Sequence, residues 1–112
     1  MEPMTPRERL QKRLESYVEE MLEVARKKNA DYANGGDPFQ NFRLSEYMGF
    51  CDTARGILVR LSDKLQRVAN LLEKSADVDD ERITDTCLDG ANYFLLLRAY
   101  LEINSEGDGG SA

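Results

Sequence analysis

Histidine is absent from this chain of 112 residues, and the only two cysteines are Cys51 and Cys87. Two isolated cysteines lack the spacing of zinc ligands, so a zinc site is not expected. Without histidine there is no imidazole to act as a general base or to complete a nucleophile–histidine–acid triad. If the protein is an enzyme, carboxylates, lysine and a bound metal ion must carry its chemistry.

Long apolar runs and excess positive charge are also missing. No stretch approaches the 18 or so apolar residues of a membrane span, and the first residues contain no signal-peptide apolar region, so we expect a cytoplasmic protein that does not enter a membrane. The net charge of −6 argues against direct binding to nucleic acid, whose phosphates attract basic surfaces. The length suits one domain, which we place at residues 1–104, followed by a disordered tail at 105–112 that is rich in glycine and serine.

The apolar spacing predicts an all-α fold, a small helical bundle of three long helices and one short helix. The first long helix starts at a capping box formed by Thr5 and Glu8 and ends near 26–28. The short helix lies at about 44–50, with Gly49 ending it. Asp52 or Thr53 caps the central helix, which spans about 56–74 and has an apolar stripe from Ile57 to Leu72. The last helix, about 81–103, is apolar around so much of its circumference that we expect protein on all sides of its later half. A short connection makes the central and last helices antiparallel.

Between the first helix and the short one, residues 29–43 combine turn-forming residues with aromatic side chains. We expect an ordered loop packed on the helices, and two interpretations of it remain open. The aromatic side chains Tyr32, Phe39 and Phe42 could stack on a base, or they could close one end of the bundle. Under the first interpretation, polar contacts come from Asn29, Asp31, Asn41 and Arg43.

Charged residues form a second stripe on the central helix, beside its apolar stripe, and they comprise Arg60, Asp63, Lys64 and Arg67. Three polar residues of the last helix, Asp85, Asp89 and Asn92, share one face at a spacing of four and then three residues. An E-x-x-E pair on the first helix, Glu20 and Glu23, has a spacing that can chelate a divalent cation, although a solvated acidic face is the simpler interpretation. We call the seven residues on the central and last helices the polar seam, and we expect its two halves to face each other.

Three interpretations of the polar seam compete. The helices could simply join their charged edges through ion pairs, which are common and individually weak. Alternatively, the arginines and the lysine could bind a phosphate group while Asn92 contacts a base or sugar. In the catalytic interpretation, Asp63, Lys64, Asp85 and Asp89 form the reaction centre. There, Asp85 and Asp89 with Asp63 or a glutamate of the first helix hold Mg²⁺, which oxygen ligands favour over zinc.

Four motifs together resemble the nucleotide modification associated domain family, first type, which comprises helical proteins of phages and prophages. They are Lys28-Asn-Ala-Asp-Tyr32, Asp37-Pro-Phe-Gln-Asn-Phe42, Val59-Arg-Leu-Ser-Asp-Lys-Leu-Gln-Arg67 and Asp85-Thr-Cys-Leu-Asp-Gly-Ala-Asn-Tyr93. The resemblance spans about Leu22 to Leu101. In size and helical layout this family is also similar to the MazG-like all-α nucleoside triphosphate pyrophosphohydrolases. The MazG-like pattern is E-x-x-E followed by E-x-x-D; Glu20-x-x-Glu23 has the first spacing, whereas the later pair is Asp85-x-x-x-Asp89.

The resemblance implies a phage-encoded protein that acts on nucleotides in the host cytoplasm. Its activity would be Mg²⁺-dependent hydrolysis of a nucleoside triphosphate, with an ordinary or modified base, to the monophosphate and pyrophosphate. It also implies a homo-oligomer. The motif positions that it implies for nucleotide binding are Asn29, Asp31, Tyr32, Arg60, Arg67, Asn92 and Tyr93, with Asp85, Asp89, Glu20 and Glu23 as metal ligands. The alternative is a non-catalytic phage protein that sequesters a nucleotide signal or inhibits a host protein.

Overall fold

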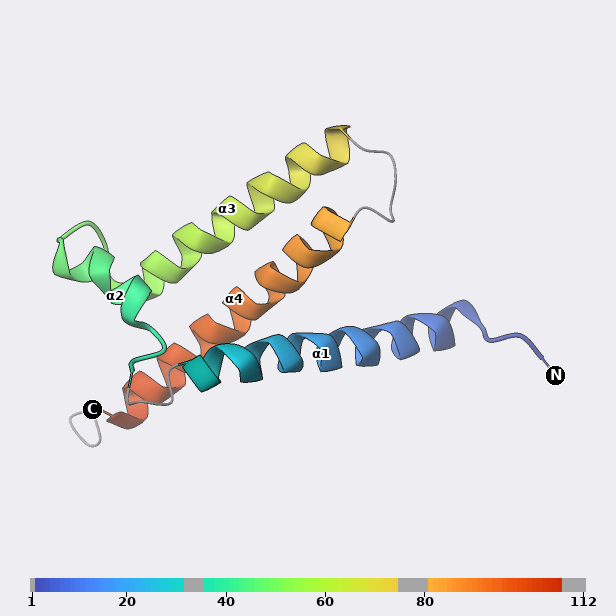
Figure 1. Cartoon of the computed structure of the whole chain (residues 1–112), viewed down its shortest axis with the longest axis horizontal. Coiled ribbons are helices and arrows are strands. Elements are labelled where there is room, and N and C mark those ends of the chain that lie inside the picture. The colour runs from blue at the N-terminus through green and yellow to red at the C-terminus, as the bar shows by residue number, and fades with distance from the viewer. Residues whose placement is uncertain (1, 32–35, 75–80, 108–112) are drawn as a thin grey trace. The chain divides into compact units, whose positions relative to one another are not determined.

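The computed structural model describes residues 2–31, 36–74 and 81–107, with the side chains of 29–31 and 107 left out. In this part of the chain the protein is all-helical (Figure 1). The helices are α1 (Pro6–Asp31), α2 (Gln40–Tyr47), α3 (Thr53–Lys74) and α4 (Glu81–Gly107). None of the described helices combines the length and the apolar character needed to cross a membrane.

The chain divides into two compact units, Met1–Gly35 and Gly36–Ala112. The first unit contains α1, whose start confirms Thr5 as the cap of the predicted capping box. The Glu8 backbone N–H donates to Thr5 Oγ1 over 3.1 Å, and that hydroxyl lies 3.0 Å from Glu8 Oε1. Leu10, Leu14 and Val18, which follow one another at four-residue spacing along α1, are exposed.

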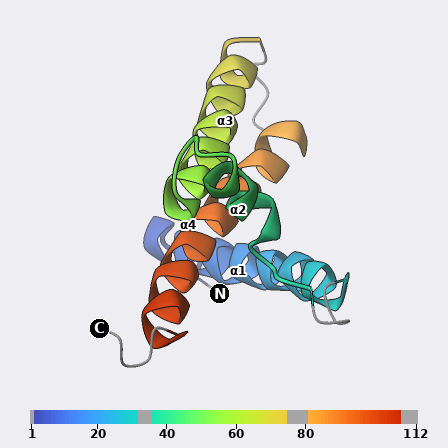
Figure 2. The ribbon, with the colours of Figure 1, turned by 90° about the vertical axis from the view of Figure 1, so that its left-hand side faces the viewer.

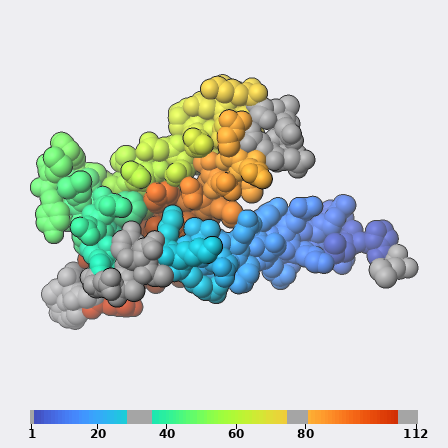
Figure 3. All heavy atoms as spheres, viewed as in Figure 1, coloured from blue at the N-terminus to red at the C-terminus, as the bar shows by residue number. Residues whose placement is uncertain are grey.

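In the second unit, α3 and α4 pack side by side and run in opposite directions, as predicted (Figure 2). The yellow end of α3 lies against the orange start of α4 in the space-filling view (Figure 3). The short α2 packs on the beginning of α3. At Gly56 the two backbones come so close that a Cβ atom would lie 2.7 Å from Ser45 Oγ and 3.1 Å from the Phe42 carbonyl oxygen. Glycine at this position therefore allows the close approach of α2 to α3.

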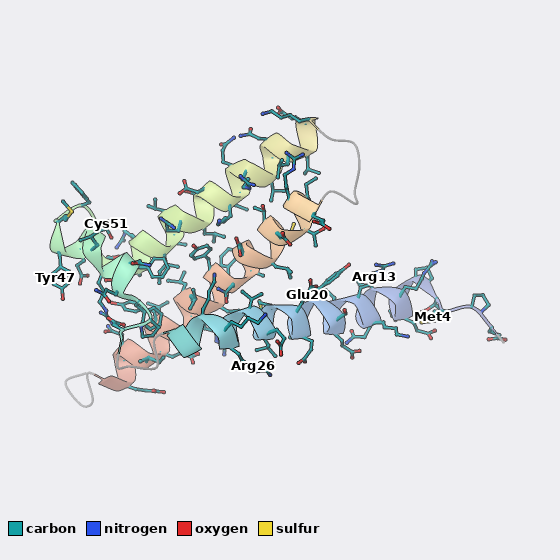
Figure 4. The ribbon with its side chains drawn as sticks, viewed as in Figure 1. Met4, Arg13, Glu20, Arg26, Tyr47 and Cys51 are labelled. Carbon is teal, nitrogen blue, oxygen red and sulfur yellow. The ribbon has the colours of Figure 1, made fainter. Side chains whose placement is uncertain are left out.

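The turn from α2 into α3 follows the predicted chemistry. Gly49 has a φ of +77° and donates its N–H to the Glu46 carbonyl, which ends α2. Asp52 Oδ1 then accepts the N–H of Arg55 over 2.8 Å, capping α3. Tyr47 and Cys51 mark this turn (Figure 4).

Several of the predicted helix boundaries differ from the observed ones by three or four residues. α1 continues to Asp31 and α2 begins at Gln40, so the expected loop at 29–43 is helical at both ends. α4 continues to Gly107, three residues into the expected tail. Residues 32–35, the linker at 75–80 and residues 108–112 lie outside the described part. α1 and α4 are longer than predicted because polar residues near their ends, such as Asn29 and Ser105, disfavour the helical conformation only weakly.

The core of the second unit is small. Phe39, Ile57 and Tyr100 are buried together, and the rings of Phe39 and Tyr100 meet edge to face with centroids 5.3 Å apart. Leu61 and Leu71 are also buried. Half of the predicted stripe of α3 is not buried, however, because Leu58, Leu65 and Leu72 are exposed. In the later half of α4, Phe94, Leu95, Leu101 and Ile103 are exposed in the single chain, so the cover expected for this half is not observed within the chain.

Candidate functional site

An ion pair between α3 and α4 lies at the centre of the polar seam. Lys64 Nζ is 3.3 Å from Asp89 Oδ2, and both side chains are partly buried. The same ammonium lies 6.0 Å from the centroid of the Tyr93 ring, within the range of a cation–π contact. Three of the predicted site residues therefore meet as one contact group between the two helices.

A second link between the helices involves a residue that the sequence interpretation missed. Arg67 Nε donates to Thr86 Oγ1 over 3.2 Å, and the Thr86 hydroxyl donates to the Arg82 carbonyl oxygen over 2.6 Å. Thr86 is buried. Its position was detectable, because Arg82, Thr86, Asp89 and Tyr93 follow one another at helical spacing on one face of α4. Sequence reasoning selected the charged residues Asp85 and Asp89 and missed Thr86 because its side chain is uncharged.

The other members of the polar seam are more open. Arg60, Asp63 and Asp85 are exposed, whereas Asn92 is partly buried. The two halves of the polar seam were expected to face each other. This is observed for Lys64 and Arg67 of α3, which contact α4 directly.

The aromatic residues ahead of α3 pack into the fold. Phe42 meets Tyr93 edge to face, with centroids 5.9 Å apart, and Phe39 is in the core. Arg43 lies over the rings of Phe39 and Tyr100, at 5.9 and 5.5 Å from their centroids. Its Nε donates to Asp37 Oδ2, and this hydrogen bond raises the pKa of Arg43. Phe39 and Phe42 therefore close one end of the α3–α4 pair, which was one of the two interpretations of this segment; Tyr32 lies outside the described residues.

A polar hollow of about 500 Å³ continues the seam toward the end of α3. Its lining includes three cationic side chains, Arg67 and Lys74 from α3 and Arg82 from α4. Asp63, Gln66, Asn70 and Leu71 complete it. This volume lies within the range of small-molecule sites in proteins. The lining of the hollow is therefore positively charged, although the net charge of the whole chain is −6.

The carboxylates expected to bind metal lie on α1 in the first unit and on α4 in the second. Among the residues that the structure describes, no three histidine, cysteine, aspartate or glutamate side chains gather closely enough to hold a metal ion. Asp89 is engaged by Lys64. Glu20, labelled in Figure 4, and Glu23 are exposed on α1, in the first unit. A carboxylate oxygen of Glu23 lies 3.5 Å from Arg26 Nη1. Asn29 and Asp31 belong to the last turn of α1, and their side chains are outside the description.

Comparison with known proteins identifies no relative: the sequence matches no family model, and neither a curated protein nor a solved structure is significantly similar to the chain.

Proposed function

We propose that this protein binds a nucleotide along the polar seam, with the phosphate groups in the polar hollow. The observation that carries the proposal is the convergence of Arg67, Lys74 and Arg82 on a hollow large enough for a nucleotide. A phosphate chain is complementary in charge to these three side chains.

Each lining group has a role that its chemistry suits. Arginine guanidinium groups bind phosphate oxygens in a bidentate manner, and lysine contributes a point charge. The hydrogen bond to Thr86 orients Arg67, so less side-chain entropy is lost when it binds an anion. The amides of Gln66 and Asn70 offer donors and acceptors for a sugar or a base.

Hydrolysis to a nucleoside monophosphate and pyrophosphate is the catalytic form of this proposal, and it rests on the family resemblance. Asp63 at the hollow and Asp85 and Asp89 on α4 are the oxygen donors available to Mg²⁺. A magnesium ion needs only one or two protein carboxylates when substrate phosphates complete its coordination. When bound, the ion would polarise a phosphoryl oxygen and lower the pKa of a coordinated water molecule. The resemblance further suggests a phage-encoded protein that works in the host cytoplasm as a homo-oligomer.

The experiment pairs binding with turnover. Purified protein is titrated with a panel of nucleoside mono-, di- and triphosphates, with and without Mg²⁺, and the products are separated by chromatography. Arg67→Gln should weaken nucleotide binding about tenfold, as expected for loss of a charged hydrogen bond. Arg55→Gln is the matched control, because Arg55 is exposed at the start of α3 and pairs with Asp52. Equal affinities for the two variants would reject the site.

Non-catalytic binding is the second candidate function. It is favoured by the engagement of Asp89 with Lys64, which leaves that carboxylate less available to a metal ion. Here the protein sequesters a nucleotide signal, or its acidic surface occupies a basic site on a host protein. Nucleotide recovered intact after release would support sequestration, whereas pyrophosphate formation would exclude it. A host-protein complex that survives Arg60→Ala and Arg67→Ala would favour inhibition.

A further inference from the structure

Three cationic side chains stand at seven-residue intervals on α3. They are Arg60, Arg67 and Lys74, and all three are exposed. Seven residues fall about 20° short of two full turns, so these cations form one stripe, which extends over about 21 Å of the helix axis. We call it the cationic stripe. Arg67 and Lys74 line the polar hollow, whereas Arg60 lies outside it.

The cationic stripe lacks carboxylate partners. No ion pair in the described part of the chain includes any of its three members. Arg67 donates instead to the uncharged hydroxyl of Thr86, and Asp63, which stands between Arg60 and Arg67 in sequence, pairs with neither of them. Four other cations of the second unit do pair with a carboxylate: Arg43 with Asp37, Arg55 with Asp52, Lys64 with Asp89 and Arg98 with Glu102.

Arg82 adds a cation from the opposite helix. The Lys64–Asp89 ion pair sets the register of the antiparallel helices (Figure 1). The hydrogen bond between Arg67 and Thr86, three residues further along α3 and three residues back along α4, fits the same register. Continuing in this register places Arg82 level with the part of α3 between its two cations that line the hollow. A ligand that contacts all of these cations must therefore be elongated and negatively charged along its length.

The hollow offers few groups that could distinguish one base from another. Its described lining contains no aromatic side chain, and the ring of Tyr93, further along α4, packs against Phe42 and Lys64. The two amides of the lining bond to each other, with Gln66 Nε2 donating to Asn70 Oδ1 over 3.2 Å. Proteins that bind exposed bases stack them on aromatic rings. We therefore expect the phosphate chain of a ligand, and not its base, to determine affinity.

We propose that the cationic stripe binds linear condensed phosphates, including inorganic polyphosphate that carries no nucleoside. The inference rests on the proposed function, since the polar hollow is again the place where phosphate binds. Neighbouring groups of a condensed phosphate share one oxygen atom, so its negative charges follow one another more closely than those of a nucleic acid strand, whose phosphates are separated by sugars. A triphosphate covers only part of the stripe, whereas a longer chain can follow it from Lys74 to Arg60.

The first test asks whether a nucleoside is needed. The full chain is titrated by calorimetry, in EDTA, with inorganic tripolyphosphate and separately with ATP, GTP, CTP and UTP. All five affinities should agree within about fivefold, because the hollow binds the phosphate chain that they share. A larger preference for one of the nucleotides, or failure of tripolyphosphate to bind where ATP binds, would overturn the inference, since the base or sugar would then be recognised.

The second test uses Arg60, which only a long ligand reaches. Arg60→Gln should weaken binding of a linear polyphosphate of about ten units about tenfold and change tripolyphosphate binding less than about twofold. The dependence of polyphosphate affinity on salt should become shallower by about one unit of log–log slope. Arg98→Gln is the matched control, because it removes the same charge at an exposed residue that pairs with Glu102. Equal losses for the two variants would overturn the inference.

The outcomes separate this inference from the proposed function. If Arg67→Gln weakens ATP binding no more than Arg55→Gln does, phosphate does not bind in the hollow, and both proposals fail. If Arg67→Gln weakens ATP binding but Arg60→Gln leaves polyphosphate binding unchanged, the proposed function stands and the inference fails. A single-stranded oligonucleotide with the same number of phosphates that binds more tightly than polyphosphate would also overturn the inference, because the stripe would then be a nucleic-acid site.

Discussion

Lys64 of α3 and Asp89 of α4 form an ion pair of 3.3 Å between helices whose contacts organise the second unit. The pair lies between the closed aromatic end of the α3–α4 pair and the polar hollow. It therefore marks the boundary between the part of the seam that stabilises the fold and the part that is open to a ligand.

The Lys64–Asp89 pair should contribute little to stability. We expect a double-mutant cycle with Lys64→Met and Asp89→Asn to give a coupling free energy of about 0.5–1 kcal/mol in urea unfolding, since both side chains are partly in solvent. The coupling should fall as salt screens the charges. A coupling of several kcal/mol that salt leaves unchanged would mean that the pair is fully desolvated.

Replacing Gly56 or Gly90 by alanine should change the free energy of unfolding in opposite directions. Gly56→Ala should lower the free energy of unfolding by about 1–3 kcal/mol, because the added Cβ meets Ser45 Oγ at 2.7 Å and the Phe42 backbone at 3.1 Å. Gly90→Ala should raise it by up to about 1 kcal/mol, since the new Cβ makes ordinary contact with Leu61 and alanine favours helix. Urea titrations of both variants measure this, and destabilisation by Gly90→Ala would show that the gap beside Leu61 is tighter than described.

Removal of the Thr86 hydroxyl should affect both stability and binding. Thr86→Val keeps the shape of the side chain but deprives Arg67 Nε of its acceptor. We expect the free energy of unfolding to fall by about 1 kcal/mol. Nucleotide affinity, measured by calorimetry, should fall with it, because Arg67 loses its fixed orientation. Unchanged affinity would show that Arg67 needs no positioning by α4.

The cap of α3 should make stability depend on pH in the acid range. The hydrogen bond from the Arg55 backbone N–H, together with the Arg55 guanidinium, lowers the pKa of Asp52. A carboxylate with a depressed folded-state pKa stabilises the fold above its unfolded value of about 3.9 and loses that contribution as the pH falls through the folded value.

The difference in unfolding midpoint between the native chain and Asp52→Ala should therefore be constant from pH 7 to about 5 and should shrink below about 4. Urea unfolding at several pH values measures it. A difference that grows on acidification would contradict the cap assignment.

Local signals predicted the elements well. The caps at Thr5 and Asp52 and the helix end at Gly49 are short-range features, and the structure has all three. The antiparallel arrangement of α3 and α4 and the facing of Lys64 toward α4 also followed from helical spacing. The helix ends were predicted less well, because polar residues such as Asn29 and Ser105 are compatible with either helix or coil.

The amino-acid sequence by itself determined the all-helical class, the positions of the caps and the separation of charged from apolar stripes, since each depends on residues within a few turns of one another. Only the tertiary structure decided which stripe is covered. Helical spacing places Leu61 and Leu65 in the same apolar stripe of α3. Leu61 nevertheless faces α4 and is buried, whereas Leu65 faces away from α4 and is exposed. The same holds for Thr86, whose role depends on Arg67, 19 residues away in sequence. Burial and pairing are properties of two elements together, and no single helix encodes them.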